Sequence, residues 1–333
     1  MRLRVAILAI GVGLAWPGVA LGAGGPVPPV QGAGNGISVS GSPYQYVALS
    51  AGRSTVVQQL KRTGPVRSSI RVPGQYGIPG VGYNGQTTGL SADGGTLVLA
   101  DLPGNSTPRT TRLIVVAAPV LTVREQIVLR GWFTVDAISP TGHFLYLIHY
   151  PSSDISKYEV RAYDLAHHRL LRAPIVDPHD RGEAMTGFAV TRATSRDGRW
   201  DYTLYIRSND VPFIHALDTV ALRAVCIDLP SVNQADLGNA TLNLGPGGSV
   251  LSIEAQGRAL ARVDTATYAV TRVTERAPSA PPTPRPAPRG GQSSGGGGGD
   301  STPWAVVALL LVAAAAFAVA GLGARRRARA RIS

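Results

Sequence analysis

The chain has 333 residues, with 32 Lys and Arg against 20 Asp and Glu, and a net charge of +12. Two of the arginines precede the first apolar run, two lie in a Pro-rich segment near the end and five follow the last apolar run. The charge between these segments is close to balanced and no base-reading motif accompanies it, so we expect no nucleic-acid partner.

The first 23 residues have the layout of a secretory signal peptide. Arg2 and Arg4 precede an uncharged apolar run at 5–16, and small residues follow up to Ala23. Cleavage is expected after Gly22 or Ala23, with Ala20 as the alternative. A retained anchor is the rival interpretation, but the run is shorter than the roughly 20 residues that a spanning helix needs. Residues 24–34 are then a short disordered leader.

Residues 35–276 contain a short sequence motif that is repeated. Glycine-containing turns begin at Ser40, Ser91, Ser139, Ser195 and Gly245, a spacing of about 50 residues that is typical of repeat folds. An apolar strand follows each turn, and up to three further short strands complete each repeat. The pattern predicts an all-β fold: a β-propeller of about five four-stranded blades. A β-sandwich is the main alternative, although sandwiches seldom have so long an internal period.

The sequence motifs of the repeats resemble those of YVTN-type and related exported bacterial propellers. The matching turns are SADG, SPTG, SRDG and GPGG, which begin at residues 91, 139, 195 and 245, and the matching strand ends are AYDL, ALDT and RVDT. This resemblance covers most of residues 36–275 and implies a propeller. The first repeat lacks Asp-Gly in its turn, and the second has AAPV where the other repeats have an aspartate-containing strand end.

The recurring aspartates and glycines are interpreted as turn-forming residues. Serine and aspartate side chains bond nearby backbone amides, and glycine adopts the positive φ that other residues resist. The carboxylates do not alternate as in a calcium loop. The structural set is Asp93, Gly94, Gly142, Asp164, Asp197, Gly198, Asp218 and Asp264.

Two connections, residues 74–89 and 176–192, are longer than a plain repeat requires. Long loops on a rigid scaffold commonly carry function. The second loop supplies five candidate ligand-contact residues, for which a solvated connection is the alternative interpretation: Asp177, His179, Asp180, Arg181 and Glu183.

Motifs for catalysis are absent from the sequence: it has no GxSxG, HExxH or P-loop. The histidines lack metal-ligand spacing, and Cys226 is the single cysteine, which we expect to be a buried thiol. We therefore predict no catalytic residue, metal or cofactor. Acidic and histidine residues from distant blades can nevertheless meet at a propeller axis.

The end of the chain reads as a membrane anchor. Residues 277–303 are a Pro-rich and then Gly-rich stalk. Residues 304–324 are uncharged and, at 1.5 Å per residue, long enough for one transmembrane helix of about 31 Å. The arginines of the basic tail, 325–333, place the C-terminus in the cytoplasm.

These features predict a single-pass protein of the bacterial cell membrane whose N-terminal domain is extracytoplasmic. The expected function is a non-enzymatic binding or scaffold module, whose partners are the membrane and an unknown extracellular protein or cell-envelope ligand. The alternative is an exported propeller hydrolase, lactonase or oxidoreductase with a site at the propeller axis.

Overall fold

The computed structural model describes residues 26–62, 64–104, 107–180, 185–207 and 210–273. These belong to one compact unit that ends at Arg276. The predicted signal peptide, stalk, transmembrane segment and basic tail lie outside the described residues. Within those residues, no helix has both the length and the apolar character needed to cross a membrane.

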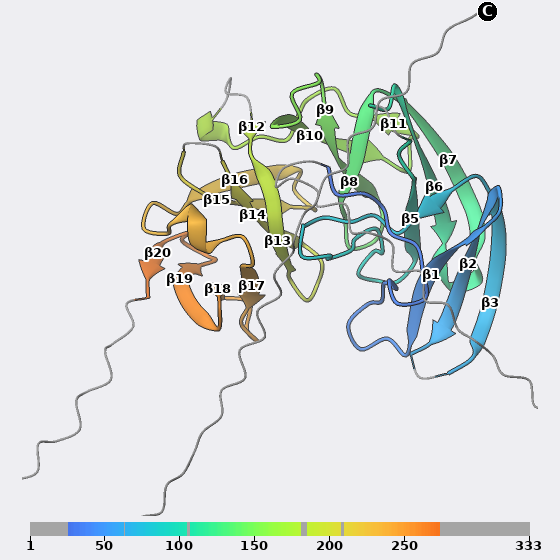
Figure 1. Cartoon of the computed structure of the whole chain (residues 1–333), viewed down its shortest axis with the longest axis horizontal. Coiled ribbons are helices and arrows are strands. Elements are labelled where there is room, and N and C mark those ends of the chain that lie inside the picture. Colours follow the sequence, from blue (N-terminus) through green and yellow to red (C-terminus); the bar gives the residue numbers. More distant parts are fainter. Residues whose placement is uncertain (1–25, 63, 105–106, 181–184, 208–209, 274–333) are drawn as a thin grey trace, which may run out of the picture. The chain divides into compact units, whose positions relative to one another are not determined.

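The described chain forms five antiparallel sheets in sequence order, which we call sheets I to V (Figure 1). Sheet I contains β1 (Tyr44–Ala51), β2 (Ser54–Lys61) and β3 (Val66–Pro73). Sheet II contains β4 (Tyr76–Gly77), β5 (Thr96–Asp101), β6 (Thr110–Ala117) and β7 (Thr122–Arg130). Sheet III contains β8 (Trp132–Ile138), β9 (Phe144–Tyr150), β10 (Lys157–Asp164), β11 (Arg169–Leu170) and β12 (Met185–Thr186).

Sheet IV contains β13 (Phe188–Thr194), β14 (Trp200–Ile206), β15 (Phe213–Asp218) and β16 (Arg223–Asp228). Sheet V contains β17 (Thr241–Leu244), β18 (Val250–Ala255), β19 (Arg258–Asp264) and β20 (Val270–Arg272). Three short 3-10 helices lie between strands: η1 (Ala118–Val120), η2 (Pro178–Asp180) and η3 (Gln234–Asp236).

This arrangement confirms the all-β prediction and the repeat of five sheets. Strands follow one another within a sheet, as in the order β13-β14-β15-β16, and this is how a propeller blade is built. The strand count per sheet differs from the expected four in two places, because sheet I has three strands and sheet III has five, with β12 paired to β10.

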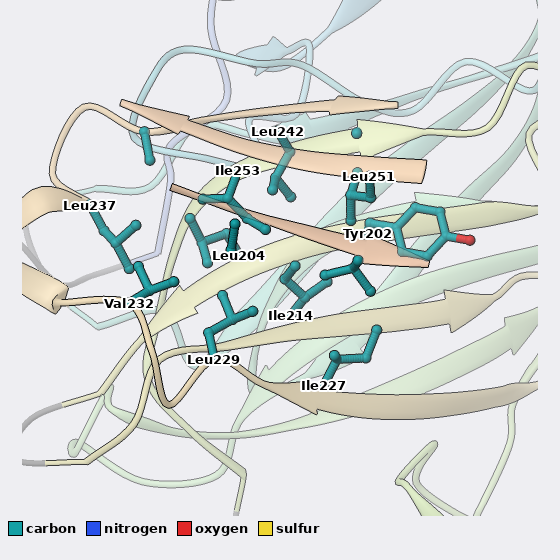
Figure 2. Close-up of a cluster of buried hydrophobic side chains, with 14 of the residues drawn as sticks. Tyr202, Leu204, Ile214, Ile227, Leu229, Val232, Leu237, Leu242, Leu251 and Ile253 are labelled. Carbon is teal, nitrogen blue, oxygen red and sulfur yellow. The ribbon is translucent and has the colours of Figure 1, made fainter. Parts of the chain in front are cut away.

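Burial explains why these segments are strands. In β2 every second residue is buried, which is the period-2 pattern of a strand with one covered face. In β5 the first five residues are all buried, because sheet II has a neighbouring sheet on each side. Four apolar clusters fill the spaces between consecutive sheets I–II, II–III, III–IV and IV–V. Figure 2 shows the cluster between sheets IV and V, where Leu204 and Ile214 face Leu242 and Ile253.

No fifth apolar cluster joins sheet V to sheet I among the described residues. The face of sheet V that points away from sheet IV carries Thr241, Asn243 and Arg262, all exposed. A groove of about 1100 Å³ has residues 37–40, which precede sheet I, and residues 244–248 of sheet V among its walls. Sheets I and V are therefore the ends of the packed series.

Candidate functional site

The loop after β11 is attached to the outer edge of sheet IV by Asp177. Among the described strands, none lies beside the outer edge of β16. The Asp177 carboxylate bonds to this edge instead: its Oδ2 accepts a 2.8 Å hydrogen bond from the backbone N–H of Cys226. Its Oδ1 accepts from the N–H of His179 at 2.9 Å. Burial opposes ionisation of Asp177, but these donors outweigh it and hold its pKa below the ordinary value.

The structure brings together three of the five ligand-contact candidates. Asp177 is buried, the His179 side chain is 92% exposed and its Nδ1 lies 2.9 Å from the Asp177 carboxylate, and Asp180 ends the short helix η2 beside them. Arg181 and Glu183 lie outside the described residues.

Cys226 completes this group from a distant part of the sequence. Its Sγ, one oxygen of Asp177 and one oxygen of Asp180 all lie within 4.8 Å of one another. Burial raises the pKa of the Cys226 thiol to about 12, and the adjacent Asp180 and Asp177 carboxylates add to the shift. The sequence analysis missed this grouping because Cys226 is 49 residues from Asp177 and no motif links them.

Buried polar side chains form a second group between sheets III and IV. The Arg192 guanidinium donates to the Asp136 backbone oxygen and carboxylate, and its Nε donates to Thr203 at 2.8 Å. Burial opposes the charge of Arg192, yet the Asp136 carboxylate more than offsets this and raises the arginine pKa. The sequence analysis did not identify this pair, whose members are 56 residues apart.

His215 lies on the same face of sheet IV, next to Thr203 on β14 and Cys226 on β16. It is 1% exposed, and neither ring nitrogen has a hydrogen-bond partner within the part of the chain that the structure describes. Burial lowers the His215 pKa to about 4, so the ring is neutral at physiological pH.

The long loop 74–89 extends from sheet II to the first strand of sheet IV. Asn84 Nδ2 donates to Thr191 Oγ1 at 2.7 Å, and Gln86 exchanges hydrogen bonds of 2.5 and 2.7 Å with the backbone of Arg192. Sheets II and IV are not consecutive, so the loop joins two sheets that are separated along the chain by sheet III. We call residues 79–86 the plug.

The N-terminal segment 26–31 runs along the same region. Val30 pairs with Ile78 as an isolated bridge, and a Cβ on Gly80 would come within 2.5 Å of Val27. The sequence analysis assigned these residues to the leader, and here they pack against the base of the plug. Residues 27–30 therefore pack closely against residues 77–80 at the start of the plug.

The turn residues occupy comparable positions in successive sheets. Gly94, Gly142 and Gly198 have φ values of +70, +70 and +72°, and Ser91, Ser139 and Ser195 each accept a bond from a backbone N–H five residues later. The Asp93 and Asp197 carboxylates accept the hydroxyl of the serine two residues before. At the strand ends, Asp164, Asp218 and Asp264 each accept two backbone N–H groups of the next turn.

A cleft of about 810 Å³ opens between sheets II and III. Its walls include several prolines, Trp132, the buried Phe133, and the polar residues Asp101, Arg109 and Arg112. Burial raises the pKa of Asp101 despite the neighbouring Arg112. A cleft of this size, with apolar walls and a few polar groups, has the character of a ligand site.

No protein-family model matches the chain. No curated protein matches it. Among solved structures it is similar to TolB from Acinetobacter baumannii, with 12% identity over 72% of this chain and 52% of TolB and a TM-score of 0.42. It is also similar to the Swd1 beta-propeller domain from Myceliophteria thermophila, with 12% identity over 74% of this chain and 67% of that one and a TM-score of 0.41.

A third similar structure is a putative 6-phosphogluconolactonase from Bacteroides uniformis, with 15% identity over 70% of this chain and 68% of that one and a TM-score of 0.40. The chain spans about half the length of the TolB chain that it matches. The description of the fold as propeller-type rests on the five sheets of this chain.

Proposed function

We propose that this protein is a membrane-anchored extracytoplasmic binding module of the bacterial cell surface, built on a β-propeller of the YVTN type. The apolar run at 304–324 and the arginines after it are the basis for the anchor and its orientation. The bound partner is an extracellular protein or a cell-envelope component.

The observation that carries this proposal is the plug. Gln86 and Asn84 are bonded to β13, and Arg192 is 6% exposed and paired with Asp136. These polar groups thus hold sheets II, III and IV together, while the cleft between sheets II and III is open to a ligand.

The cleft suggests how a ligand would be held. Trp132 supplies flat apolar surface, and Arg112 and Arg109, both exposed, supply hydrogen-bond donors at the rim. Aromatic and arginine side chains contribute the largest shares of binding energy at protein interfaces. A peptide or polymer with apolar and acidic groups fits this combination.

The experiment compares three full-length chains in native membranes: wild type, Trp132→Ala with Arg112→Ala, and the control Arg130→Ala outside the cleft. Envelope fractions are cross-linked to each chain and the recovered components are quantified. We expect the same component from wild type and control and a loss of about tenfold or more from the cleft variant, a scale set by hot-spot truncation. Equal recovery from all three chains would refute the cleft as the binding surface.

Enzymatic activity is tested on the same preparation with lactone, ester and phosphoester substrates. We expect the wild-type chain to show no turnover above that of a sample without protein. Turnover by the wild type that disappears in Asp136 or Arg192 variants shown by circular dichroism to be folded would support the axial enzyme instead.

A further inference from the structure

Sheet I carries the net charge of the domain. Residues 44–73 contain five basic residues and no acidic one, and the first acidic residue of the chain is Asp93. Residues 74–276 contain 18 basic and 19 acidic residues, so the remaining sheets are close to neutral. All five basic residues of sheet I and its turns are exposed: Arg53, Lys61, Arg62, Arg67 and Arg71.

These cations have no acidic partner within the part of the chain that the structure describes. There, every ion pair made by a lysine or arginine belongs to sheets III and IV, as in Lys157 with Asp154 and Arg199 with Asp218. Charges of one sign that gather on one surface repel one another. An anionic partner outside the chain would relieve this repulsion.

Three of the cations lie at one end of sheet I, beside an aromatic ring and an exposed apolar side chain. Lys61 ends β2 and is opposite Tyr44 in the β1–β2 register. The Arg67 guanidinium lies 4.8 Å from the centre of the Tyr44 ring. Val66, which is 46% exposed, begins β3, the outer strand of sheet I (Figure 1). We call Tyr44, Lys61, Arg62, Val66 and Arg67 the basic end.

This combination of side chains favours a lipid surface as the partner. Anionic head groups attract lysine and arginine, apolar side chains enter the boundary between head groups and acyl chains, and tyrosine prefers the same depth. A soluble polyanion would neutralise the cations but would offer nothing to Val66. We propose that the basic end docks the domain on the anionic phospholipid surface of the membrane, a contact that rests on the anchor proposed above.

The anchor and the basic end have different tasks. A few cations at an anionic surface bind only weakly by themselves, whereas a tether keeps the domain at a high effective concentration beside the bilayer. The docked contact therefore forms while the domain is anchored, and a domain cut free within 277–303 dissolves. Docking would fix which face of the anchored domain is turned away from the membrane.

The test uses the full-length chain reconstituted into vesicles of phosphatidylcholine alone or of phosphatidylcholine mixed with phosphatidylglycerol. Flotation with the neutral vesicles measures the anchor separately. Docking is measured by acetylation with a reagent that does not cross the bilayer, followed by mass spectrometry. Lys61 and Lys157 are the two lysines of the chain, so Lys157, which is exposed on sheet III, is an internal reference for the same molecules.

We expect the ratio of Lys61 to Lys157 acetylation to fall by about fivefold or more in the anionic vesicles, because three cations at an anionic surface favour the docked state beyond that factor. The ratio should return to its neutral-vesicle value in 1 M salt, where the Debye length is only about 3 Å.

Matched variants separate the basic end from a general effect of charge. Arg62→Glu with Arg67→Glu should restore the neutral-vesicle ratio in anionic vesicles. The control is Arg262→Glu with Arg272→Glu, which makes the same change of charge at two exposed arginines of sheet V and should leave Lys61 protected. Circular dichroism verifies that each variant is folded.

Four results would overturn the proposal. A ratio that is equal in the two kinds of vesicle, with flotation intact, would refute docking and leave the anchor standing. Protection that persists in the Arg62→Glu, Arg67→Glu variant would assign the effect to the surface potential acting on the reagent. Equal protection by soluble polyphosphate in neutral vesicles would make the basic end a polyanion site instead. A chain that does not float with neutral vesicles would refute the anchor and the docking that depends on it.

Discussion

At the residue scale, the buried pair of Arg192 and Asp136 is the most sensitive point of the structure. Their side chains are 6% and 2% exposed. Removing one member of such a pair leaves the other charge in a low-dielectric interior, and this is far more costly than removing both.

We predict that Arg192→Leu lowers the free energy of unfolding by about 3–5 kcal/mol. The double variant with Asp136→Leu should be more stable than this single variant. Urea denaturation measures the free energy of unfolding of both variants. Lys157→Leu is the control, because Lys157 and Asp154 form a solvent-exposed ion pair that is worth less than about 1 kcal/mol. A loss no larger than that of the control would contradict the prediction.

His215 makes stability depend on pH. The His215 pKa is about 4 in the folded protein, whereas a solvent-exposed histidine has a pKa of about 6.5. Between these values the unfolded chain binds more protons, so stability rises with pH. The contribution is fully present above about pH 6.5 and is lost as the pH falls toward 4, with a total on the order of 3 kcal/mol.

Unfolding free energies of the chain at pH 7 and pH 4.5 test this dependence on pH. We expect His215→Phe to flatten the decline between the two values, whereas His143→Gln, an exposed histidine, should leave it unchanged. The groups around His215 that also act on its charge are Asp136, Arg192 and Asp177. If the unfolding free energy of His215→Phe fell between pH 7 and 4.5 as steeply as that of the wild type, the decline would be due to these neighbouring groups and not to His215.

At the element scale, the plug depends on close backbone contact. A Cβ on Gly82 would lie 2.8 Å from the Val190 backbone oxygen and 3.2 Å from the Thr191 Cα. We predict that Gly82→Val displaces residues 79–86 from β13 at a cost of about 1–3 kcal/mol, the usual range for overpacking.

Hydrogen-exchange mass spectrometry measures the displacement of residues 79–86 from β13 directly. Exchange should increase at 79–86 and 190–192 in Gly82→Val and stay at the wild-type level in Gly34→Val, since nothing lies within 4 Å of a Cβ at Gly34. Equal protection in both variants would mean that the plug is not held at this position.

At the scale of the whole molecule, the end sheet V should be less stable than the interior sheet IV. Sheet V is packed by one apolar cluster, whereas sheet IV contributes to two. In repeat folds each unit is stabilised by its neighbours, so a unit with one neighbour opens more readily.

We predict faster amide exchange in β18 and β19 than in β14 and β15 of the full chain. The comparison is internal, because all four strands carry ladder hydrogen bonds on both sides. Equal protection factors would indicate that sheet V has a second partner.

Membrane topology is tested on spheroplasts. Protease added outside should release the domain by cutting within 277–303, because exposed unstructured backbone is cut before packed sheet. Deleting residues 302–333 should release the domain as soluble protein. A truncated chain that stays membrane-bound after signal cleavage would refute the single anchor.

The sequence alone was sufficient for the all-β class and for the five repeats. Both follow from local rules: apolar residues alternate along a strand, and a turn such as SADG needs glycine where φ is positive. The same locality explains why the loops 74–89 and 176–192 were recognisable as insertions. The residues that these loops contact were not recognisable, because they lie far from the loops in the sequence and leave no local pattern.

Only the tertiary structure decided what those partners are. It placed Gln86 against Arg192, which is 106 residues away, and Asp177 against Cys226. It also showed that, among the described residues, four apolar clusters serve five sheets. The physical reason is the same throughout: these contacts join side chains from different sheets, and their positions are set by how whole sheets pack, which a period of turns and strands does not encode.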